Sequence, residues 1–317
     1  MVDRAGLRAR HAAGGGLVPD HLAATSALLE ATFPGAGAGD AAYLRWLYDD
    51  SPFGPVVETN LDDDQGRAGH YAIVPVELAA GGAARAGALS LNTAVSERAR
   101  GGGVFTRLAA DTYALAAQRG IEVVVGVANA NSTPGFVRRL DFTLVTPLPA
   151  TVLVPLPGRD GGVRTLAATA HGALEQPGLD ALLAPPSSGL TTRWTRERLA
   201  WRLARPGRSY LLHHGPGVLA VSALDRRGPV HVAVLLAVFA AQAVPSAVGA
   251  AVVRAACRAH RAPLALHVGV NERLSLRGLP LPARLRPSPL NLIYRDLATG
   301  GPAPALSRWE FLDFDAY

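Results

Sequence analysis

The hydrophobic period changes several times along the first half of the chain. Apolar residues recur at helical spacing in two early segments, residues 20–33 and 43–48, and Asp40 is placed to cap the second. Strand-like patterns follow at residues 56–60, 69–78 and 86–95. The pattern therefore predicts two helices followed by a strand-rich stretch.

A glycine turn at residues 101–103 separates these strands from a longer helical pattern. One helical face after the turn is apolar, at Phe105, Leu108, Ala109, Thr112, Leu115 and Ala116. Gly120 ends this helix, and residues 121–128 are apolar on both faces, which is typical of a central strand. Ser132 is expected to cap a short helix with Pro134 in its first turn, and a strand follows at residues 142–154.

The same order of elements returns in the second half, after a segment rich in Gly, Pro and Ala at residues 158–188. Helices are expected at residues 194–203 and 246–260. Strands are expected at residues 209–213, 218–224, 231–239, 263–270 and 291–297. The repetition predicts an internal duplication with copies of about 150 residues, and it divides the chain into domains at residues 1–155 and 156–317.

The composition is that of a globular protein. Hydrophobic residues make up 49% of the chain and charged residues 18%, which is enough apolar material for a core. The longest apolar stretch, residues 230–244, is interrupted by His231 and Gln242 and is too short to span a bilayer. Because no apolar signal segment follows Met1, we expect a cytoplasmic protein that does not enter a membrane.

The cysteine and lysine content excludes several kinds of site and reaction. The single cysteine, Cys257, excludes an intramolecular disulfide and a cysteine-rich zinc site, and no cluster has metal-ligand spacing, so no metal is expected. All 31 basic residues are arginine, which excludes a Schiff-base lysine. The net charge of +6 has two interpretations. It reflects the codon bias of a GC-rich genome, or it provides a surface for a nucleotide-bearing cofactor or an RNA.

Residues 92–108 carry the most informative motif. They place a strand, a glycine turn flanked by Arg98 and Arg100, and an amphipathic helix in succession. Glycines allow positive φ angles and a close approach of the backbone to a ligand. The unpaired N–H groups and the dipole at the start of a helix favour an anion. We therefore expect an anion site of the kind that holds a pyrophosphate.

Within this motif, Arg98-x-x-Gly101-x-Gly103 matches the [Gln/Arg]-x-x-Gly-x-[Gly/Ala] signature of the GNAT superfamily of acyl-CoA-dependent N-acyltransferases. Residues 43–154 as a whole resemble that family. The resemblance implies an α/β (α+β) fold of two tandem GNAT-like domains, each a mixed, mostly antiparallel twisted sheet flanked by helices. The second copy lacks the glycines at residues 239–246, so it is expected to bind no acyl-CoA and to complete the acceptor cleft, with an ordered C-terminal tail.

The resemblance also implies where acetyl-CoA, or another acyl-CoA, binds. Its pyrophosphate would lie on the backbone amides of the glycine turn, and its pantetheine arm would run between two splayed strands. The segment from Asn129 to Phe136 resembles the family's next motif. The implied cofactor residues are Thr93, Ala94, Val95, Arg98, Arg100, Gly101, Gly102, Gly103, Val104, Asn129, Asn131, Ser132 and Phe136.

Two departures from the family pattern stand out. The family's Leu-Gly-Phe is Leu140-Asp141-Phe142 here, so the turn glycine is missing. The tyrosine that often protonates the departing thiolate has no clear counterpart, because Phe136 or Val137 stands in its place and neither can donate a proton. Another group, or solvent, would have to supply this proton, or catalysis is not the function.

Several residues are candidates for the catalytic steps. A backbone N–H near residues 93–95 is the expected oxyanion donor, with Asn92 as an orienting residue. His70 or Glu77 is a candidate general base, and because they are seven apart in one strand they face opposite sides. The alternatives are a hydrogen-bonded structural histidine and a solvated carboxylate.

The C-terminal residue, Tyr317, is a further candidate. In some tandem GNAT acetyltransferases that modify aminoglycosides, the terminal carboxylate enters the catalytic site as the base. The resemblance makes the carboxylate of Tyr317 a candidate for the same role, with Asp313 or Asp315 recruiting a cationic amine. The alternative is a tail that only packs on the second domain.

These observations predict an acyl-CoA-dependent N-acyltransferase, most simply an acetyltransferase, acting on an amine of a small molecule. An amino sugar, an antibiotic or a natural-product intermediate would provide such an amine. One alternative keeps the fold and takes an aminoacyl group from tRNA. A second alternative is a non-catalytic CoA-binding protein. DNA is not an expected partner.

Overall fold

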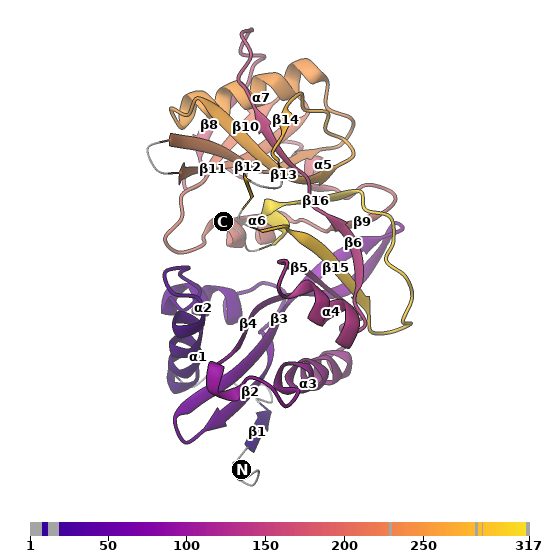
Figure 1. Cartoon of the computed structure of the whole chain (residues 1–317). Helices are drawn as coiled ribbons and strands as arrows, with labels where there is room; N and C mark the ends of the chain where they lie inside the picture. Colours follow the sequence, from indigo (N-terminus) through magenta and orange to yellow (C-terminus); the bar gives the residue numbers. More distant parts are fainter. Residues whose placement is uncertain (1–7, 12–18, 228–229, 283–284, 287, 315–317) are drawn as a thin grey trace. The chain divides into compact units, whose positions relative to one another are not determined.

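The computed structural model describes residues 8–11, 19–227, 230–282, 285–286 and 288–314 (Figure 1). The chain folds into two compact units. The first unit comprises Met1–Glu77, Arg85–Val145 and Asn291–Ala303. The second unit comprises Leu78–Ala84, Thr146–Leu290 and Pro304–Tyr317. Each unit is built around one sheet, and the two sheets are described separately.

The sheet of the first unit has the strand order β1-β2-β3-β4-β5-β15-β6. Its members are β1 (Arg8–His11), β2 (Val57–Asp63), β3 (Gly66–Ala80), β4 (Ala83–Val95), β5 (Val123–Ala128), β15 (Asn291–Asp296) and β6 (Thr143–Pro147). Strands β4 and β5 are parallel, whereas β2 pairs with β1 and β3, and β5 with β15, in antiparallel register. The predicted mixed, mostly antiparallel sheet is confirmed.

Four helices belong to this unit: α1 (Pro19–Thr32), α2 (Ala41–Tyr48), α3 (Val104–Gln118) and α4 (Thr133–Arg139). The side chain of Asp40 accepts a hydrogen bond from the Tyr43 N–H at 2.7 Å, which confirms the predicted cap of α2. Ser132 occupies the N-cap position of α4 and Pro134 lies in its first turn, as predicted, but the Ser132 side chain makes no cap hydrogen bond.

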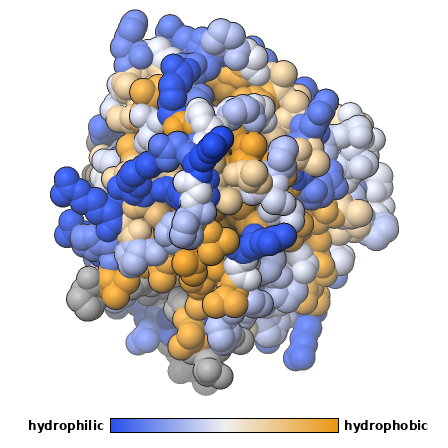
Figure 2. Space-filling view, turned by 90° about the horizontal axis from the view of Figure 1, so that it is seen from above, coloured by the Kyte–Doolittle hydropathy of each residue, from blue (hydrophilic) through white to orange (hydrophobic). Residues whose placement is uncertain are grey.

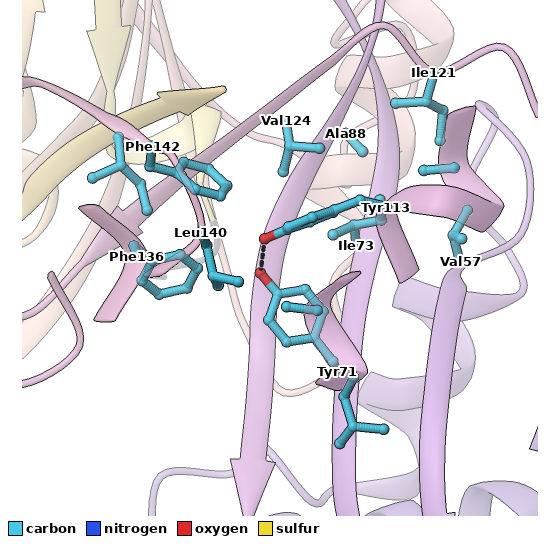
Figure 3. Packing of buried hydrophobic residues seen from close by; sticks show 14 of the residues in the cluster. Val57, Tyr71, Ile73, Ala88, Tyr113, Ile121, Val124, Phe136, Leu140 and Phe142 are labelled. Atoms are coloured by element: carbon cyan, nitrogen blue, oxygen red, sulfur yellow. Dashed lines mark hydrogen bonds between the residues drawn. The ribbon is translucent and has the colours of Figure 1, made fainter. Parts of the chain in front are cut away.

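The core between the first sheet and helices α3 and α4 is mostly aliphatic and contains a cluster of aromatic residues (Figure 3). The hydroxyls of Tyr71 on β3 and Tyr113 on α3 are hydrogen-bonded to each other, and their rings meet edge-on with centroids 5.6 Å apart. Phe136 on α4 packs edge-on against Phe142 at 5.2 Å. Burial raises the pKa of Tyr71 to about 12, so this cluster is neutral and holds α3 on the sheet.

The second unit repeats this order of elements around a sheet with the strand order β14-β7-β13-β12-β11-β10-β8, and β16 pairs with β13. Its strands are β7 (Ala150–Leu153), β8 (Arg164–Ala167), β10 (Leu211–Gly215), β11 (Val218–Arg227), β12 (Val230–Ala240), β13 (Leu264–Asn271), β14 (Leu279–Pro280) and β16 (Arg308–Glu310). Strand β9 (Leu190–Thr192) pairs instead with the end of β3, from Leu78↔Thr192 to Ala80↔Leu190. Its helices are α5 (Leu179–Leu183), α6 (Arg196–Leu203) and α7 (Ser246–Ala259). Along the chain, helix α7 connects the parallel strands β12 and β13, as helix α3 connects the parallel strands β4 and β5.

The two units exchange strands, which the sequence pattern did not reveal. Strand β15 was expected to close the second domain, but it pairs with β5 from Asn291↔Ala128 to Asp296↔Val123. The expected single strand at residues 142–154 is two strands, of which β7 pairs with β13 in the second sheet. The chain therefore does not divide at one point after residue 155: residues 146–155 lie in the second unit and residues 291–303 in the first.

Ion pairs of Arg85, in addition to the backbone pairing with β5, hold strand β15 in the first sheet. Arg85 on β4 donates to Asp296 on β15 at 3.2 Å and to Glu122, just before β5, at 2.6 Å. The Leu297 N–H donates to the Glu122 carbonyl at 2.7 Å. These contacts link three strands whose order in the sequence does not predict that they are neighbours.

The surface mixes apolar and hydrophilic side chains. Figure 2 shows hydrophobic patches lying between hydrophilic side chains on the face turned to the viewer. No helix in the part of the chain that the structure describes is long and apolar enough to cross a membrane.

Candidate functional site

The central strands of the first sheet separate part of the way along their length. Strands β4 and β5 pair from Gly87↔Val123 to Ser90↔Gly126, and their ladder ends there although β4 continues to Val95. On this side of β4, residues 91–95 therefore have no ladder partner in β5, and we call this unpaired stretch of the strand edge the opening. Since backbone N–H and C=O groups need partners, this edge suits an extended ligand that carries amides.

The glycine turn lies at the end of the same strand. Gly101, Gly102 and Gly103 have φ angles of 91°, 58° and 76°, in the region that favours glycine. A Cβ atom on any of the three would meet nothing within 4 Å, so the requirement is conformational rather than spatial. Helix α3 begins at Val104 without a side-chain cap, which leaves its first N–H groups for an anion. The predicted order of strand, turn and helix is confirmed.

The two arginines of the motif have different surroundings. Arg98 donates to both carboxylate oxygens of Asp63, at the end of β2, at 2.9 and 3.0 Å, and to the Arg67 carbonyl at 3.3 Å. This hydrogen bond lowers the pKa of Asp63. Arg98 therefore braces the turn against the β2–β3 hairpin. The side chain of Arg100 is 59% exposed and lies 3.5 Å from Glu97, so it is the arginine that can reorient toward an anion.

The end of β5 is shaped by Asn129. Its side-chain oxygen accepts from the N–H groups of Asn131 and Ser132 at 3.0 and 2.9 Å, and its carbonyl accepts from the Thr133 hydroxyl at 2.7 Å. Asn129 thus closes the turn that precedes α4, and it sets the path of the chain into this helix. Phe136, a predicted cofactor residue, is 7% exposed and packs among core aromatics.

Asp141 explains the missing glycine of the family's Leu-Gly-Phe sequence. Its φ angle is 54°, which lies in the left-handed region. Aspartate and asparagine enter this region more readily than other residues with a side chain. The backbone conformation of the turn is therefore kept, although the residue is different.

Four polar residues form a hydrogen-bonded chain on the other face of the sheet. His70 on β3 is fully buried, with Nδ1 2.7 Å from the Asn60 side-chain oxygen and Nε2 2.9 Å from the Tyr48 hydroxyl. Nδ1 also lies 3.5 Å from a carboxylate oxygen of Glu58. The side-chain amide of Asn92 on β4 donates to the Tyr48 oxygen at 3.4 Å. Because it is buried, His70 cannot act as a base on a substrate without an intermediary.

His70 and Asn92 were candidates from the sequence, whereas Asn60 and Glu58 were not. Tyr48 was noted only as a residue that could line an acceptor pocket, without a link to His70. Asn60 and Glu58 stand at alternate positions of one strand, so they share a face, and that alternation was the available signal. Tyr48 is remote from them in the sequence. Only the folded sheet brings these side chains together.

The other candidates do not join this chain. Glu77 is partly exposed on β3, and strand alternation turns it to the face opposite His70. Tyr317 and Asp315 lie outside the described residues. Asp313 is buried, accepts from the Trp194 indole N–H at 2.9 Å and caps the last turn, so the expectation that it recruits an amine is wrong.

Thr93 lies on the stretch of β4 that has no ladder with β5. Its Oγ1 atom is buried and has no hydrogen-bond partner in the described part of the chain. Buried polar atoms are seldom left unpaired in native proteins. An acyl-CoA fits this donor set, because the β4 edge and Thr93 would meet its amides and the glycine turn would meet its pyrophosphate.

The equivalent opening in the second unit is filled by the chain itself. Strands β12 and β13 pair only from Val232↔Leu264 to Leu235↔His267, and β16 then pairs with β13 from Gly269↔Glu310 to Asn271↔Arg308. The Val238 N–H donates to the Glu310 carboxylate at 3.1 Å, and Asn271 donates to the Val238 carbonyl at 2.8 Å. A protein segment thus satisfies the β12 edge that corresponds to residues 91–95 of β4.

Titratable residues elsewhere form local contacts and no metal centre. Within the described ranges, no three His, Cys, Asp or Glu side chains are grouped as metal ligands. His213 on β10 contacts the hydroxyls of Thr165 and Ser222 at 2.9 and 2.7 Å, and Ser222 contacts His260 at 2.8 Å. Burial lowers the pKa of His213 to about 4.

Comparison with solved structures assigns the fold. A GCN5-related N-acetyltransferase from Anabaena variabilis superposes with a TM-score of 0.63 at 11% identity, over 92% of this chain and 73% of that chain. One from Kribbella flavida gives a TM-score of 0.62 at 15% identity, over 92% and 71%. The Saccharomyces cerevisiae N-myristoyltransferase with bound myristoyl-CoA gives 0.61 at 10% identity, over 93% and 83%. No family model and no curated protein matches the sequence. The chain has the GNAT fold, in tandem.

Proposed function

We propose that this chain is an acyl-CoA-dependent N-acyltransferase, most simply an acetyltransferase, that acts on a primary amine of a small molecule. The observation that carries the proposal is the junction of two features in the first unit. The β4 edge beyond Ser90 has no ladder with β5, and β4 is followed, after the short 3₁₀ turn Glu97–Ala99, by the uncapped glycine turn of α3. The solved N-acetyltransferases and the myristoyl-CoA-bound N-myristoyltransferase with the same fold support this proposal.

Each part of the site has a distinct role in this proposal. Bound acyl-CoA would supply an acyl group activated as a thioester. The N–H groups of Gly101 to Val104 hold the pyrophosphate, with Arg100 adding positive charge. The backbone of residues 93–95 and the Thr93 hydroxyl hold the extended arm, and one N–H there stabilises negative charge on the acyl oxygen.

Proton transfer to the leaving group does not come from the tyrosines of the α3 face. Tyr71 and Tyr113 are buried and hydrogen-bonded to each other, and burial raises the pKa of both. We assign this step to solvent. Proximity and orientation then supply most of the rate enhancement.

Calorimetric titration with acetyl-CoA is the first test, followed by release of free CoA thiol with glucosamine, kanamycin, spermidine and tyramine. Micromolar binding and amine-dependent thiol release are expected. The absence of binding would contradict the proposal, and aminoacyl-tRNA would then be tested as donor. Binding without turnover on a broad amine panel would favour the non-catalytic alternative. The cytoplasmic location stays a prediction.

A further inference from the structure

The side chain of Asn92 lies on an unexpected face of the sheet. Ser90, two residues earlier on β4, contacts the Tyr71 hydroxyl at 3.0 Å on the α3 face. Regular alternation would turn Asn92 to that same face. Asn92 instead contacts Tyr48, whose hydroxyl meets His70, and residues 70 and 71 of β3 point to opposite faces.

The backbone of Asn92 accounts for this reversal. Its φ angle of 50° is in the left-handed region, so the strand is irregular at this residue. A residue other than glycine in this region is uncommon, and it persists where the surroundings hold it. The irregularity lies two residues beyond the last β4–β5 pair, at the start of the opening.

The hydrogen-bonded chain fixes the orientation of the Asn92 amide. The Asn60 side-chain oxygen can only accept, so Nδ1 of His70 carries the proton between them. In the neutral imidazole Nε2 then accepts from the Tyr48 hydroxyl. The Tyr48 oxygen accepts from the amide nitrogen of Asn92, which leaves the Asn92 side-chain oxygen as an acceptor.

We propose that the Asn92 side-chain oxygen accepts an N–H of the attacking amine, and that Tyr48 and His70 are positioning residues that hold this oxygen in place. This inference rests on the proposed acyltransferase function. The α3 core packs on the opposite face of the sheet from Tyr48, and Asn92 lies two residues beyond the last β4–β5 pair, so in the proposed site its side chain is on the face away from α3. An Asn92 oxygen held in this way favours a nucleophile that has an N–H to donate.

The test uses Asn92→Gly, Tyr48→Phe and the control Tyr113→Phe. Glycine tolerates the φ angle of Asn92, so the first variant removes only the side chain. Tyr113→Phe removes a buried hydroxyl that is hydrogen-bonded to Tyr71 on the α3 face and has no link to Asn92. Hydroxylamine is the probe, because it is small enough to need no acceptor pocket, and acetohydroxamate formation above the uncatalysed rate is measured with acetyl-CoA.

We expect Asn92→Gly and Tyr48→Phe to lower kcat/KM for hydroxylamine about tenfold, as for the loss of one oriented hydrogen bond. In Tyr48→Phe the dissociation constant for acetyl-CoA, from calorimetry, should change less than about twofold, because the Tyr48 side chain is not among the groups that hold the cofactor. The control should keep the wild-type kcat/KM. Unchanged kcat/KM in the first two variants, or an equal loss in the control, would overturn the inference.

A second readout does not depend on activity. In a ¹⁵N-labelled chain, with the His70→Gln variant providing the assignment, long-range ¹H–¹⁵N spectra should show His70 as the neutral Nδ1–H tautomer. Its Nε2 resonance should shift in Tyr48→Phe and not in Tyr113→Phe. An Nε2–H tautomer or a positively charged ring at His70 would contradict the inference even if acetyl-CoA binds. Failure of the wild type to bind acetyl-CoA would instead contradict the acyltransferase proposal itself.

Discussion

Nε2 of His267 lies 2.8 Å from the carboxylate of Glu310, inside the second unit, where the sheet strands β12 and β13 have separated. The other carboxylate oxygen of Glu310 accepts from the Val238 N–H, and Glu310 is fully buried. The C-terminal segment thereby fills the position that an acyl-CoA arm would need. The missing glycine turn and the contacts of the C-terminal segment support the same expectation, that this unit binds no acyl-CoA.

The first prediction follows from this pair. Glu310→Ala leaves His267 and the Val238 N–H without their acceptor, so we expect a loss of about 3 kcal/mol in the free energy of unfolding. Urea denaturation measures this loss. Calorimetry on the wild type should give one acetyl-CoA per chain, and two sites would contradict the conclusion that the second unit binds none.

The glycine turn allows a test that separates charge from backbone strain. Asn and Asp have the same shape and both tolerate the φ angle of 58° at Gly102. Gly102→Asp should weaken acetyl-CoA binding at least about tenfold by placing a negative charge at the helix start, whereas Gly102→Asn should weaken it far less. Calorimetry measures both. Equal losses would place the pyrophosphate elsewhere.

Arg98 and Arg100 should respond differently to removal. Arg98→Met breaks the contact with Asp63, and a double-mutant cycle with Asp63→Asn should give a small favourable coupling in the free energy of unfolding, as is typical of an exposed pair. Arg100→Met should instead weaken acetyl-CoA binding several-fold at low salt, and this effect should shrink as salt rises. If Arg100→Met had no effect at low salt, its assignment to the phosphate would be wrong.

The stability of the second unit should depend on the protonation of His213. Burial lowers its pKa from 6.5 to about 4, so the unfolded chain binds this proton more tightly than the folded chain. The stabilisation is complete above pH 6.5 and is lost as the pH falls toward 4, by about 3 kcal/mol in total. Urea denaturation at pH 7.5 and 4.5 should show a smaller difference in His213→Gln than in the wild type. Substitution of the exposed His171 by Gln serves as the control, and the same pH slope in all three proteins would refute the assignment.

Asp141 should tolerate glycine better than a branched residue. Its φ angle of 54° is free of strain for Gly, so Asp141→Gly should change the unfolding free energy by less than about 1 kcal/mol. Asp141→Val should cost about 2 kcal/mol, because a β-branched residue is strained there. Thermal denaturation of the two variants tests this contrast. Equal stability of the two variants would contradict the prediction.

Local features of this protein were readable in the sequence. The cap at Asp40, the glycine turn at residues 101–103 and the helix after it depend on neighbours in the chain, and the structure has them as predicted. Each of these elements is fixed by hydrogen bonds and dihedral preferences within a few residues. The GNAT signature was readable for the same reason, because its ligand groups are backbone N–H groups of one continuous segment.

Only the tertiary structure decided which strands became neighbours. Strand β15 has the pattern of an ordinary final strand, but its partner β5 lies far away in the sequence. The contact between Tyr48 and His70, and the reversal of Asn92, likewise depend on how a helix and two strands pack. Hydrophobic period fixes the type of an element and its buried face, but pairing and long-range hydrogen bonds are chosen by the energy of the whole sheet.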